Sequence, residues 1–225
     1  VQSRGDTDPA NAGERNKTTM KLYDFKYAIN PMRVRLFAGE KSIPLDGSGD
    51  IALVNIDMMK GEHRSAEYRA IAPNGLVPSL VLDDGTVLQE TIAICRYLDS
   101  LYPEPNLFGA GGLEQATIEM WQRKMEFELM LPTAMTFRHC NPMAKMLEDQ
   151  VPQYGEKMHQ RARKRMQVLN KELAQKPYIA GEQFSVADIT AWCTIKFFKK
   201  LSDTPIQPEQ TALQAWYDSI SSRPS

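Results

Sequence analysis

Cysteine is scarce in this sequence, and long apolar runs are missing. Three cysteines occur among 225 residues, Cys95, Cys140 and Cys193, and their spacing fits neither a disulfide scaffold nor a metal site. We therefore expect a reducing compartment, the cytoplasm, and no bound metal. No run of about 18 apolar residues is present, and residues 1–19 lack the apolar segment of a secretory signal. The sequence accordingly predicts no association with a membrane.

A strong charge of either sign is also missing. The formal net charge is -1 and the isoelectric point is about 6.4, which argues against a broad nucleic-acid-binding surface. One local basic run contains Arg161, Arg163, Lys164 and Arg165, whose side chains point in several directions if the segment is helical. We interpret this run as a solvated helix face; the alternative is a contact with a partner or a nucleic acid. The sequence predicts no nucleic-acid partner.

The composition is that of an ordinary globular protein, with 42% hydrophobic and 24% charged residues. Its length allows two modest domains that share an interface. Residues 1–19 contain almost no large apolar side chains, so we expect a flexible N-terminal extension there. Prolines and then glycines interrupt the pattern at residues 102–112, which marks a linker. The predicted domains are therefore residues 20–101 and 113–225.

Strand and helix signals alternate in the first domain. Apolar segments at residues 21–25 and 51–56 predict short strands. Between them, Asn30 and Pro31 predict a helix start, with asparagine as the cap and proline as the first helical residue. A hairpin and a further helix follow. The order predicts a thioredoxin-like α/β domain.

The central stretch of the sequence is a hairpin followed directly by a helix start. Residues 77–88 are mostly apolar apart from Asp84-Gly85, a strong signal for a two-residue turn. Pro78 falls at the first position of the strand, which tolerates proline and leaves the preceding backbone free to pair with a ligand. Thr91 puts a hydroxyl beside the unpaired N–H groups of the next helix, where a carboxylate is favoured. We therefore expect a ligand site here.

No convincing strand follows residue 113, and the apolar spacing becomes helical. Pro132 falls within a long helix that it is expected to kink. A second helix has an apolar face made of Met158, Ala162, Met166, Leu169 and Leu173. Ser185-Val-Ala-Asp188 is similar to a capping box, a buried helix start with a structural role. The sequence predicts an all-α helical bundle as the C-terminal domain.

Several motifs, taken together, resemble the cytosolic glutathione transferase superfamily. They are Met59-Lys-Gly-Glu-His63, Asn74-Gly-Leu-Val-Pro78, Glu90-Thr91 and Tyr178-Ile-Ala-Gly-Glu-Gln-Phe-Ser-Val-Ala-Asp-Ile189. The resemblance extends from about residue 20 onward. Asn30-Pro-Met-Arg-Val-Arg35 is most similar to a bacterial and fungal branch that lacks the usual catalytic Tyr, Ser or Cys. The resemblance implies a detoxifying transferase that joins the glutathione thiolate to a hydrophobic electrophile.

The resemblance also assigns a glutathione site. It implies that Val77 and Pro78, joined by a cis bond, hold the cysteinyl backbone, and that Glu90 and Thr91 hold the γ-glutamyl amine and carboxylate. The glycyl carboxylate is assigned to the neighbourhood of Lys60, His63 and Arg64. These pairings are physically sensible, because an acid meets an ammonium and cations meet a carboxylate. Glutathione is a co-substrate, and no other cofactor is implied.

Activation of the thiol is the point at which this sequence departs from most of the family. Most members supply a tyrosine, serine or cysteine just before the first helix, and that position falls on Ala28 or Ile29, neither of which can donate. Three sources remain: the free N–H groups at the Asn30 helix start, the hydroxyl of Tyr27 or of Tyr23, and a water held by His139. The alternative for His139 is a partly exposed histidine at a helix end.

The electrophile is expected on an apolar surface of the helical domain. Candidate lining residues are Met130, Met135 and Phe137, although such side chains also suit a core. The resemblance further implies a homodimer. The alternative function, a non-catalytic glutathione-binding or structural member of the fold, is kept open by Ala28. A glutathione-dependent reductase or peroxidase would need a cysteine before the first helix, and the sequence has none there.

Overall fold

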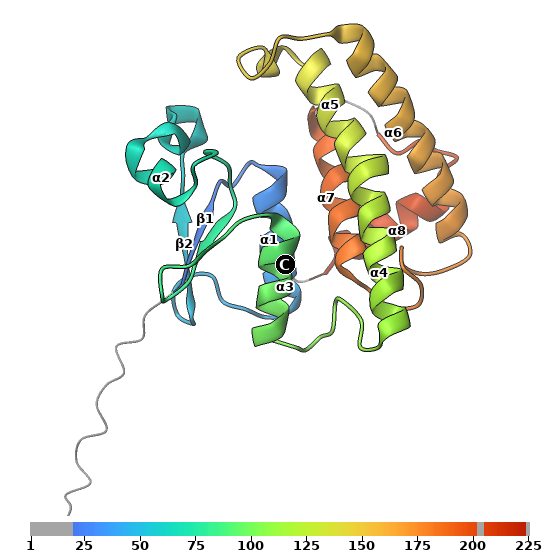
Figure 1. Ribbon diagram of the computed structural model, residues 1–225. Coiled ribbons are helices and arrows are strands. Elements are labelled where there is room, and N and C mark those ends of the chain that lie inside the picture. The colour runs from blue at the N-terminus through green and yellow to red at the C-terminus, as the bar shows by residue number, and fades with distance from the viewer. Residues whose placement is uncertain (1–19, 202–204, 224–225) are drawn as a thin grey trace, which may run out of the picture.

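The computed structural model describes residues 20–201 and 205–223, so the extension predicted at residues 1–19 lies outside the described residues. Figure 1 shows a mixed α/β domain beside a domain of long helices. The described chain passes from the first domain to the second after α3, the last helix of the α/β domain. This two-part architecture confirms the predicted fold class.

The first domain is a small mixed sheet with helices on both faces. In chain order its elements are β1 (Met20–Asp24), α1 (Ile29–Glu40), β2 (Ile51–Asn55), the short 3-10 turns η1 (Met58–Lys60) and η2 (Glu62–Arg64), α2 (Ala66–Ile71), β3 (Ser79–Val81), β4 (Val87–Leu88) and α3 (Thr91–Leu101). The strand order is β2-β1-β3-β4. Helices α1 and α3 lie between the sheet and the helical domain, and α2 lies on the far side (Figure 1). The thioredoxin-like prediction is confirmed.

Strand pairing brings four chain segments to one end of the strands, the side of the sheet at which the central strand β1 terminates. We call this side the β1 edge. Strands β1 and β2 are parallel and both end there, at Asp24 and Asn55. Strand β3 is antiparallel to β1 and begins at this edge, where Ser79 pairs with Tyr23. Strand β4 is antiparallel to β3 and ends there again. The segments before α1, after β2, before β3 and before α3 therefore meet at the β1 edge.

The turn between β3 and β4 is one residue longer than the predicted two-residue hairpin. The Leu82 N–H donates to the Thr86 carbonyl at 2.8 Å, which leaves residues 83–85 in the loop. Gly85 has a φ of 85°, in the left-handed region that favours glycine, and the Asp84 carboxylate accepts from the Thr86 N–H at 2.8 Å. The geometry is that of a three-residue hairpin closed by a left-handed glycine.

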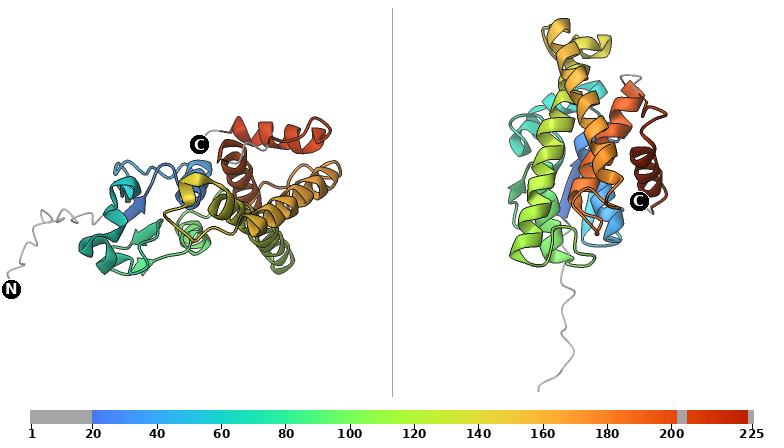
Figure 2. Two further views of the ribbon diagram at one scale, coloured as in Figure 1. Left: turned by 90° about the horizontal axis from the view of Figure 1, so that it is seen from above. Right: turned by 90° about the vertical axis from the view of Figure 1, so that its right-hand side faces the viewer.

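The second domain contains only helices among its described residues. In chain order these are α4 (Gly112–Lys124), the π-helical segment η3 (Met125–Met130), α5 (Leu131–Cys140), the 3-10 turn η4 (Pro142–Ala144), α6 (Pro152–Leu173), α7 (Val186–Leu201) and α8 (Thr211–Ser221). Figure 2 shows α5, α6 and α7 packed along one another, with α8 on the outside. All five residues of the predicted α6 face, from Met158 to Leu173, are buried. The predicted helical bundle is confirmed.

The long helix around Pro132 changes its hydrogen-bond pattern just before the proline. Proline has no N–H to donate to the carbonyl four residues earlier, so the regular ladder is interrupted there. The six residues of η3 adopt π-helical geometry, and the α-helix resumes at Leu131. Such π-helical turns are frequent at functional sites. The side chain of Glu126 in η3 reaches across to α1.

One hydrophobic core continues through both domains. It includes Leu22 and Leu80 from the sheet, Phe37 from α1, and Leu169 and Ile189 from α6 and α7. Helix α1 therefore packs against the sheet on one side and against the helical domain on the other (Figure 1). This double packing fixes the start of α1 relative to both domains.

The start of α7 is built around the buried carboxylate of Asp188. The Ser185 N–H donates to Asp188 Oδ2 at 3.0 Å, as a capping box predicts. The Ser185 hydroxyl donates to the same oxygen at 3.0 Å, whereas the serine oxygen of a capping box accepts from a helix N–H. Asp188 Oδ1 accepts from the Ile179 N–H and from Trp216 Nε1, each at 2.9 Å. Burial raises the pKa of Asp188, while these hydrogen bonds oppose the rise.

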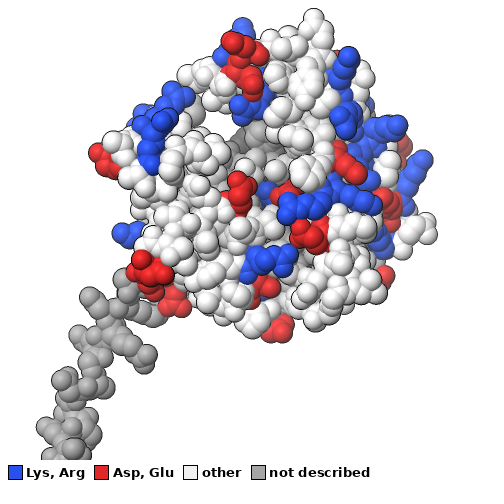
Figure 3. Space-filling model, viewed as in Figure 1, with Lys and Arg blue, Asp and Glu red and all other residues white. Residues whose placement is uncertain are grey.

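Charges of both signs are spread over the surface in Figure 3, with Lys and Arg most frequent on the side of the helical domain. Within the basic run on α6, three side chains are exposed. The fourth, Arg165, is buried and donates from Nη2 to Glu172 at 2.8 Å. None of the described helices combines the length and the apolar character needed to cross a bilayer.

Candidate functional site

Helix α1 begins two residues earlier than the sequence predicts, at Ile29 instead of Pro31. Its first residue is Ile29 and its cap position is Ala28, whose side chain cannot accept a hydrogen bond. Asn30 is thus the second helical residue, and its predicted capping role is wrong, since its Oδ1 instead accepts from Arg33 Nη1 at 3.3 Å. The Met32 N–H donates to the Ala28 carbonyl at 3.3 Å. The N–H groups of Ile29 and Asn30 therefore precede the helical ladder and point out of the helix start.

Aromatic side chains surround the turn that precedes α1. Tyr27 is 67% exposed, and its ring meets the edge of Phe25 at a centroid distance of 5.6 Å. Tyr23 on β1 packs against the ring of Tyr68 on α2, also at 5.6 Å. The Tyr68 hydroxyl donates to the Leu76 carbonyl at 2.7 Å. Tyr68 thus holds the loop before β3, and Tyr27 is the exposed phenol of this region.

The loop before β3 contains the cis peptide bond between Val77 and Pro78, as predicted. The Val77 side chain is 8% exposed and packs with Ile56 and Tyr68. Within the described part of the chain, the Val77 N–H and carbonyl take part in no backbone hydrogen bond. This segment lies at the β1 edge, where an extended ligand backbone can pair with it.

The start of α3 combines an unusual backbone with an exposed carboxylate. Glu90 has a φ of 67°, a conformation that non-glycine residues seldom adopt and that concentrates at functional sites. Thr91 is the first helical residue and is buried. The neighbouring Gln89 donates from Nε2 to Asn74 Oδ1 and to Ser79 Oγ, both at 3.3 Å. These bonds tie the start of α3 to the loop before β3.

The cationic candidates lie on η1 and η2, after β2. The Lys60 side chain is 77% exposed, with Nζ 3.4 Å from Asp57 Oδ2. Exposed Arg64 donates from Nε to His63 Nε2 at 3.2 Å. Partial burial, together with Arg64 and Arg69, lowers the pKa of His63. Because Nε2 accepts from Arg64, the neutral ring carries its hydrogen on Nδ1, and this atom is buried without a hydrogen-bond partner among the described residues.

His139 is buried at the end of α5, with 8% of its surface exposed. It is therefore not the partly exposed histidine that our alternative interpretation describes. Its Nδ1 accepts from the Val151 N–H at 3.1 Å, and its ring meets the edge of Tyr154 at a centroid distance of 5.1 Å. Because Nδ1 accepts, the neutral ring carries its hydrogen on Nε2. Nε2 is thus the atom that can donate to a further partner.

The three predicted electrophile-binding residues are all partly buried. Met130 ends η3, and its sulfur accepts from Arg33 Nη1 at 3.5 Å, which puts it beside α1. The Phe137 ring packs edge-on against Phe197 of α7 at 5.5 Å, an arrangement within the helical domain. Met135 lies between them on α5. Met130 is the candidate nearest to the start of α1.

Arg33 is a residue that sequence reasoning missed. Its side chain is 2% exposed, and its Nη2 forms an ion pair with Glu126 Oε1 at 2.8 Å. Its Nε and Nη2 donate to Thr190 Oγ1 at 3.2 and 2.9 Å. The sequence indicated only that Arg33 lies on a helix one turn after Asn30. Its partners on η3 and α7 are 93 and 157 residues away, and no local pattern connects them.

The cysteines are poorly suited to act as nucleophiles. Burial raises the pKa of Cys95 and of Cys193 to about 12 in each case. The pKa of exposed Cys140 is also raised, by local burial and by the nearby Glu156. A reactive cysteine needs the opposite shift. Among the described residues, no group of three or more His, Cys, Asp or Glu side chains could hold a metal ion.

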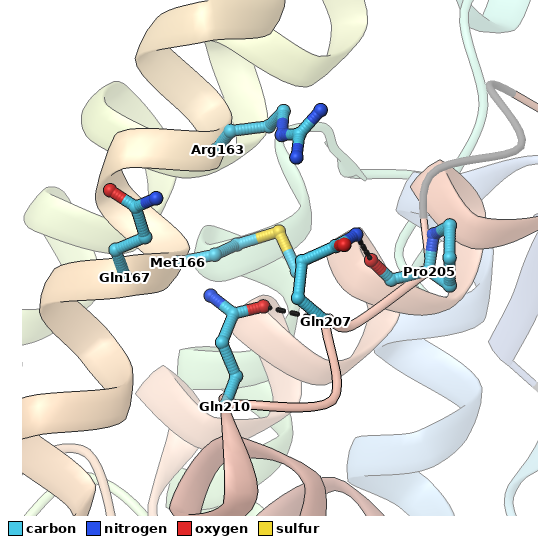
Figure 4. Close-up of a pocket in the computed structure, with 6 residues that line it drawn as sticks. All are labelled: Arg163, Met166, Gln167, Pro205, Gln207 and Gln210. Carbon is cyan, nitrogen blue, oxygen red and sulfur yellow. Dashed lines mark hydrogen bonds between the residues drawn. The ribbon is translucent and has the colours of Figure 1, made fainter.

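A small recess lies elsewhere, between α6 and the segment that leads into α8. Figure 4 shows its lining residues, Arg163, Met166, Gln167, Pro205, Gln207 and Gln210. The Gln207 N–H donates to Gln210 Oε1 at 2.8 Å, and Gln207 Nε2 donates to the Pro205 carbonyl at 2.9 Å. The side-chain amides of Gln207 and Gln210 are therefore both engaged by backbone groups of this segment. None of the predicted site residues takes part in this recess.

Comparison with protein families gives two matches along the chain. The family described as "Glutathione S-transferase, N-terminal domain" matches residues 30–101. The family described as "Glutathione S-transferase, C-terminal domain" matches residues 130–224. Together the two matches cover more than half of the chain and include α1 from its second residue onward and all of α7.

Individual proteins give the same result. Glutathione S-transferase 2 of Saccharomyces cerevisiae is 35% identical over 217 residues, which cover 96% of this chain and 91% of the yeast protein. The structure of a glutathione S-transferase domain-containing protein from Marinobacter aquaeolei superposes with a TM-score of 0.82 at 35% identity, covering 91% of this chain and 98% of that one. Gtt2 from Saccharomyces cerevisiae gives a TM-score of 0.81 at 33% identity, with coverage of 91% and 97%.

Proposed function

The chain belongs to the glutathione S-transferase family, and we propose that it activates glutathione at the start of α1, without a catalytic tyrosine, serine or cysteine. The chain is a glutathione transferase, since two domains of that family match it and a named transferase is 35% identical over 96% of it. The proposal concerns how this enzyme holds and ionises its thiol. The observation that carries it is the side chain of Ala28, which stands at the cap of α1 and cannot donate.

Glutathione binds along the β1 edge in this proposal. The cysteinyl backbone pairs with Val77, next to the cis bond to Pro78, which is supported by the unpaired backbone of Val77. The γ-glutamyl ammonium meets the exposed carboxylate of Glu90, and the γ-glutamyl carboxylate meets the start of α3 at Thr91. The glycyl carboxylate meets the cationic groups of Lys60 and Arg64, next to His63, whose Nε2 accepts from Arg64.

The thiol lies at the start of α1, where the N–H groups of Ile29 and Asn30 have no helical partner. Only the thiolate attacks, so the pKa of the thiol must fall by about two units, which corresponds to ~2.7 kcal/mol. A helix start supplies about 0.3–1 kcal/mol, and a hydrogen bond to a charged group supplies about 1.5–3 kcal/mol. The two effects together are sufficient without a side-chain hydroxyl.

As the source of a further hydrogen bond to the thiolate we propose a water held by His139, although the described contacts of this ring lie with Val151 and with Tyr154 of α6, not with α1. The hydrogen of this imidazole sits on Nε2, because Nδ1 accepts from the Val151 N–H. Such a ring donates to the water and leaves a water hydrogen free for the sulfur. Tyr27 is the competing donor, since its phenol is exposed in the turn before α1.

The electrophile is held over the helical domain beside the thiol, with Met130, Met135 and Phe137 as its proposed contacts. Met130 is supported best, because its sulfur lies 3.5 Å from Arg33 of α1. Methionine side chains adapt to apolar ligands of varied shape. The electrophile is therefore a hydrophobic molecule rather than one recognised by several polar groups. A detoxifying role and the cytoplasmic location stay predictions.

Turnover measurements separate this proposal from a binding protein without activity. With 1-chloro-2,4-dinitrobenzene as electrophile, we expect saturable conjugation that rises with pH as bound glutathione ionises. Saturable binding of glutathione by calorimetry, together with no turnover of several electrophiles, would contradict the proposed activation. It would favour the non-catalytic alternative.

A further inference from the structure

A buried cation ties the proposed thiol site to the helical domain. Arg33 projects from α1 one turn after Asn30, and all three of its side-chain nitrogens are hydrogen-bonded. Nη1 donates to Asn30 Oδ1 at 3.3 Å, and Nη2 donates to Glu126 at 2.8 Å. Nε and Nη2 share the hydroxyl of Thr190. The guanidinium therefore links the first turn of α1 to η3 and to α7.

The partners of this arginine are themselves held in place. The Thr190 hydroxyl donates to Gln122 Oε1 on α4 at 2.9 Å, which leaves the oxygen lone pairs to face the guanidinium. Both Gln122 and Thr190 are completely buried. Glu126 Oε2 accepts from Arg123 on the surface at 3.0 Å. A chain of directional bonds therefore runs from α4 and η3 through Arg33 to Asn30.

We infer that Arg33, anchored by Glu126, is a positioning residue for the thiol site, because it holds the carboxamide and hence the backbone of Asn30 at the start of α1. The inference deepens the proposed function and rests on it, since Asn30 carries one of the two N–H groups assigned to the thiol. Glutathione activation then depends on contact between the two domains. Arg33 does not touch the substrate and acts through Asn30.

The geometry favours positioning over a simple effect of positive charge. The charge of Arg33 is paired with Glu126 at 2.8 Å, so its field at the α1 start is largely cancelled. Its planar fork makes several fixed bonds at once, and a lysine cannot reproduce them. Positioning by Arg33 and a direct effect of its charge therefore predict different thiol pKa values for variants that keep the charge of Arg33 or remove the charge of Glu126.

The test measures the pKa of the thiol of bound glutathione by ultraviolet titration, together with kcat and KM. Arg33→Lys keeps the charge and removes the planar guanidinium with its several donors. We expect the thiol pKa to rise by about one unit, which gives ~10-fold less thiolate at a pH below the pKa. Glu126→Gln should raise it by a smaller amount. Both variants should lower kcat at acidic pH more than they raise the KM for glutathione.

Two further variants keep the test independent of folding defects. Asn30→Ala changes a half-exposed side chain and should give the same rise as Arg33→Lys, with no further rise in the double variant. Lys41→Met is the matched control, because Lys41 is a buried cation at the other end of α1, paired with Asp99 at 2.6 Å. It should lower the melting temperature and leave the thiol pKa unchanged.

The outcomes are distinct. A wild-type thiol pKa equal to that of free glutathione would overturn the proposed activation and this inference together. A depressed wild-type value that persists in folded Arg33→Lys and in Asn30→Ala would overturn the inference alone. A fall in the pKa with Glu126→Gln would show that Arg33 acts through its charge. An equal rise in Lys41→Met would overturn the inference, because it would show that the loss of any buried cation of α1 has the same effect.

Discussion

Backbone geometry and side-chain chemistry agree on one role for Glu90. Its positive φ and its exposed carboxylate stand at the start of α3, next to the loop that carries Val77. We expect Glu90→Ala to weaken glutathione binding by about 2 kcal/mol, or ~30-fold, because the γ-glutamyl ammonium loses its partner. Calorimetry measures this directly. Asp83→Ala is the control, since Asp83 is an exposed acid on the β3–β4 turn, and equal affinities for all three proteins would remove Glu90 from the site.

A second prediction at this scale separates His139 from Tyr27. His139→Ala should lower kcat about 10-fold and change the KM for glutathione little, because its water acts on the thiol after binding. Tyr27→Phe should change both constants by less than about 2-fold, since it removes only a hydroxyl that the proposal does not use. Steady-state kinetics at fixed electrophile decides the matter. A large loss in Tyr27→Phe with a silent His139→Ala would assign the thiol hydrogen bond to the tyrosine.

The role of a residue near the site could be predicted where a local sequence motif indicates it. It could not be predicted where the hydrogen-bond partner of that residue is far away in the sequence. The cis bond at Val77 and Pro78 followed from the family resemblance. The capping role given to Asn30 was wrong, because Arg33 engages its carboxamide. The partners of Arg33 are brought to it by the packing of α1 on α7, which no local sequence pattern contains.

Among the elements, α7 depends most on one polar group. Four donors converge on the carboxylate of Asp188, from the Ser185 N–H, the Ser185 hydroxyl, the Ile179 N–H and Trp216. We expect Asp188→Asn to lower the free energy of unfolding by about 3 kcal/mol, because the new amide hydrogens face donors. Ser185→Ala should cost about 1 kcal/mol, since it removes only the hydroxyl. Urea unfolding measures both.

Asp218→Asn is the control for this series, because Asp218 is exposed on α8 and its change should stay within about 0.5 kcal/mol. A similar loss for Asp188→Asn and Asp218→Asn would contradict the central role of the buried carboxylate. The capping box itself was readable from Ser185 and Asp188. The added bonds from Ile179 and Trp216 were not, because they come from other parts of the helical domain.

The elements themselves were largely predictable, and their ends less so. All five apolar residues that the spacing assigned to one face of α6 are buried, and Gly155 and Arg165 are buried with them. The turn at Asp84-Gly85 was found but was assigned two residues instead of three, because a left-handed glycine after Asp84 serves both turn types. The π-helical segment before Pro132 was expected only as a kink, since the missing N–H of proline indicates a disturbance but not its form.

At the scale of the whole molecule, the family resemblance predicts a two-fold symmetric homodimer in which the α/β domain of one subunit packs on the helical domain of the other. Sedimentation velocity at micromolar concentration should give twice the mass of the 225-residue chain. Partial dissociation on dilution would be consistent with this expectation. A monomer throughout the micromolar range would contradict it.

We propose that this transferase ionises glutathione at the start of α1 although Ala28 occupies the cap. The pKa of the thiol of glutathione bound to the unaltered enzyme tests this claim most directly, by ultraviolet titration of the thiolate. A free thiol has a pKa of about 8.5. We expect the pKa of the bound thiol to be about two units lower, so that most bound glutathione is thiolate at neutral pH. A bound thiol that titrates like free glutathione, in an enzyme that still binds the tripeptide, would contradict the account.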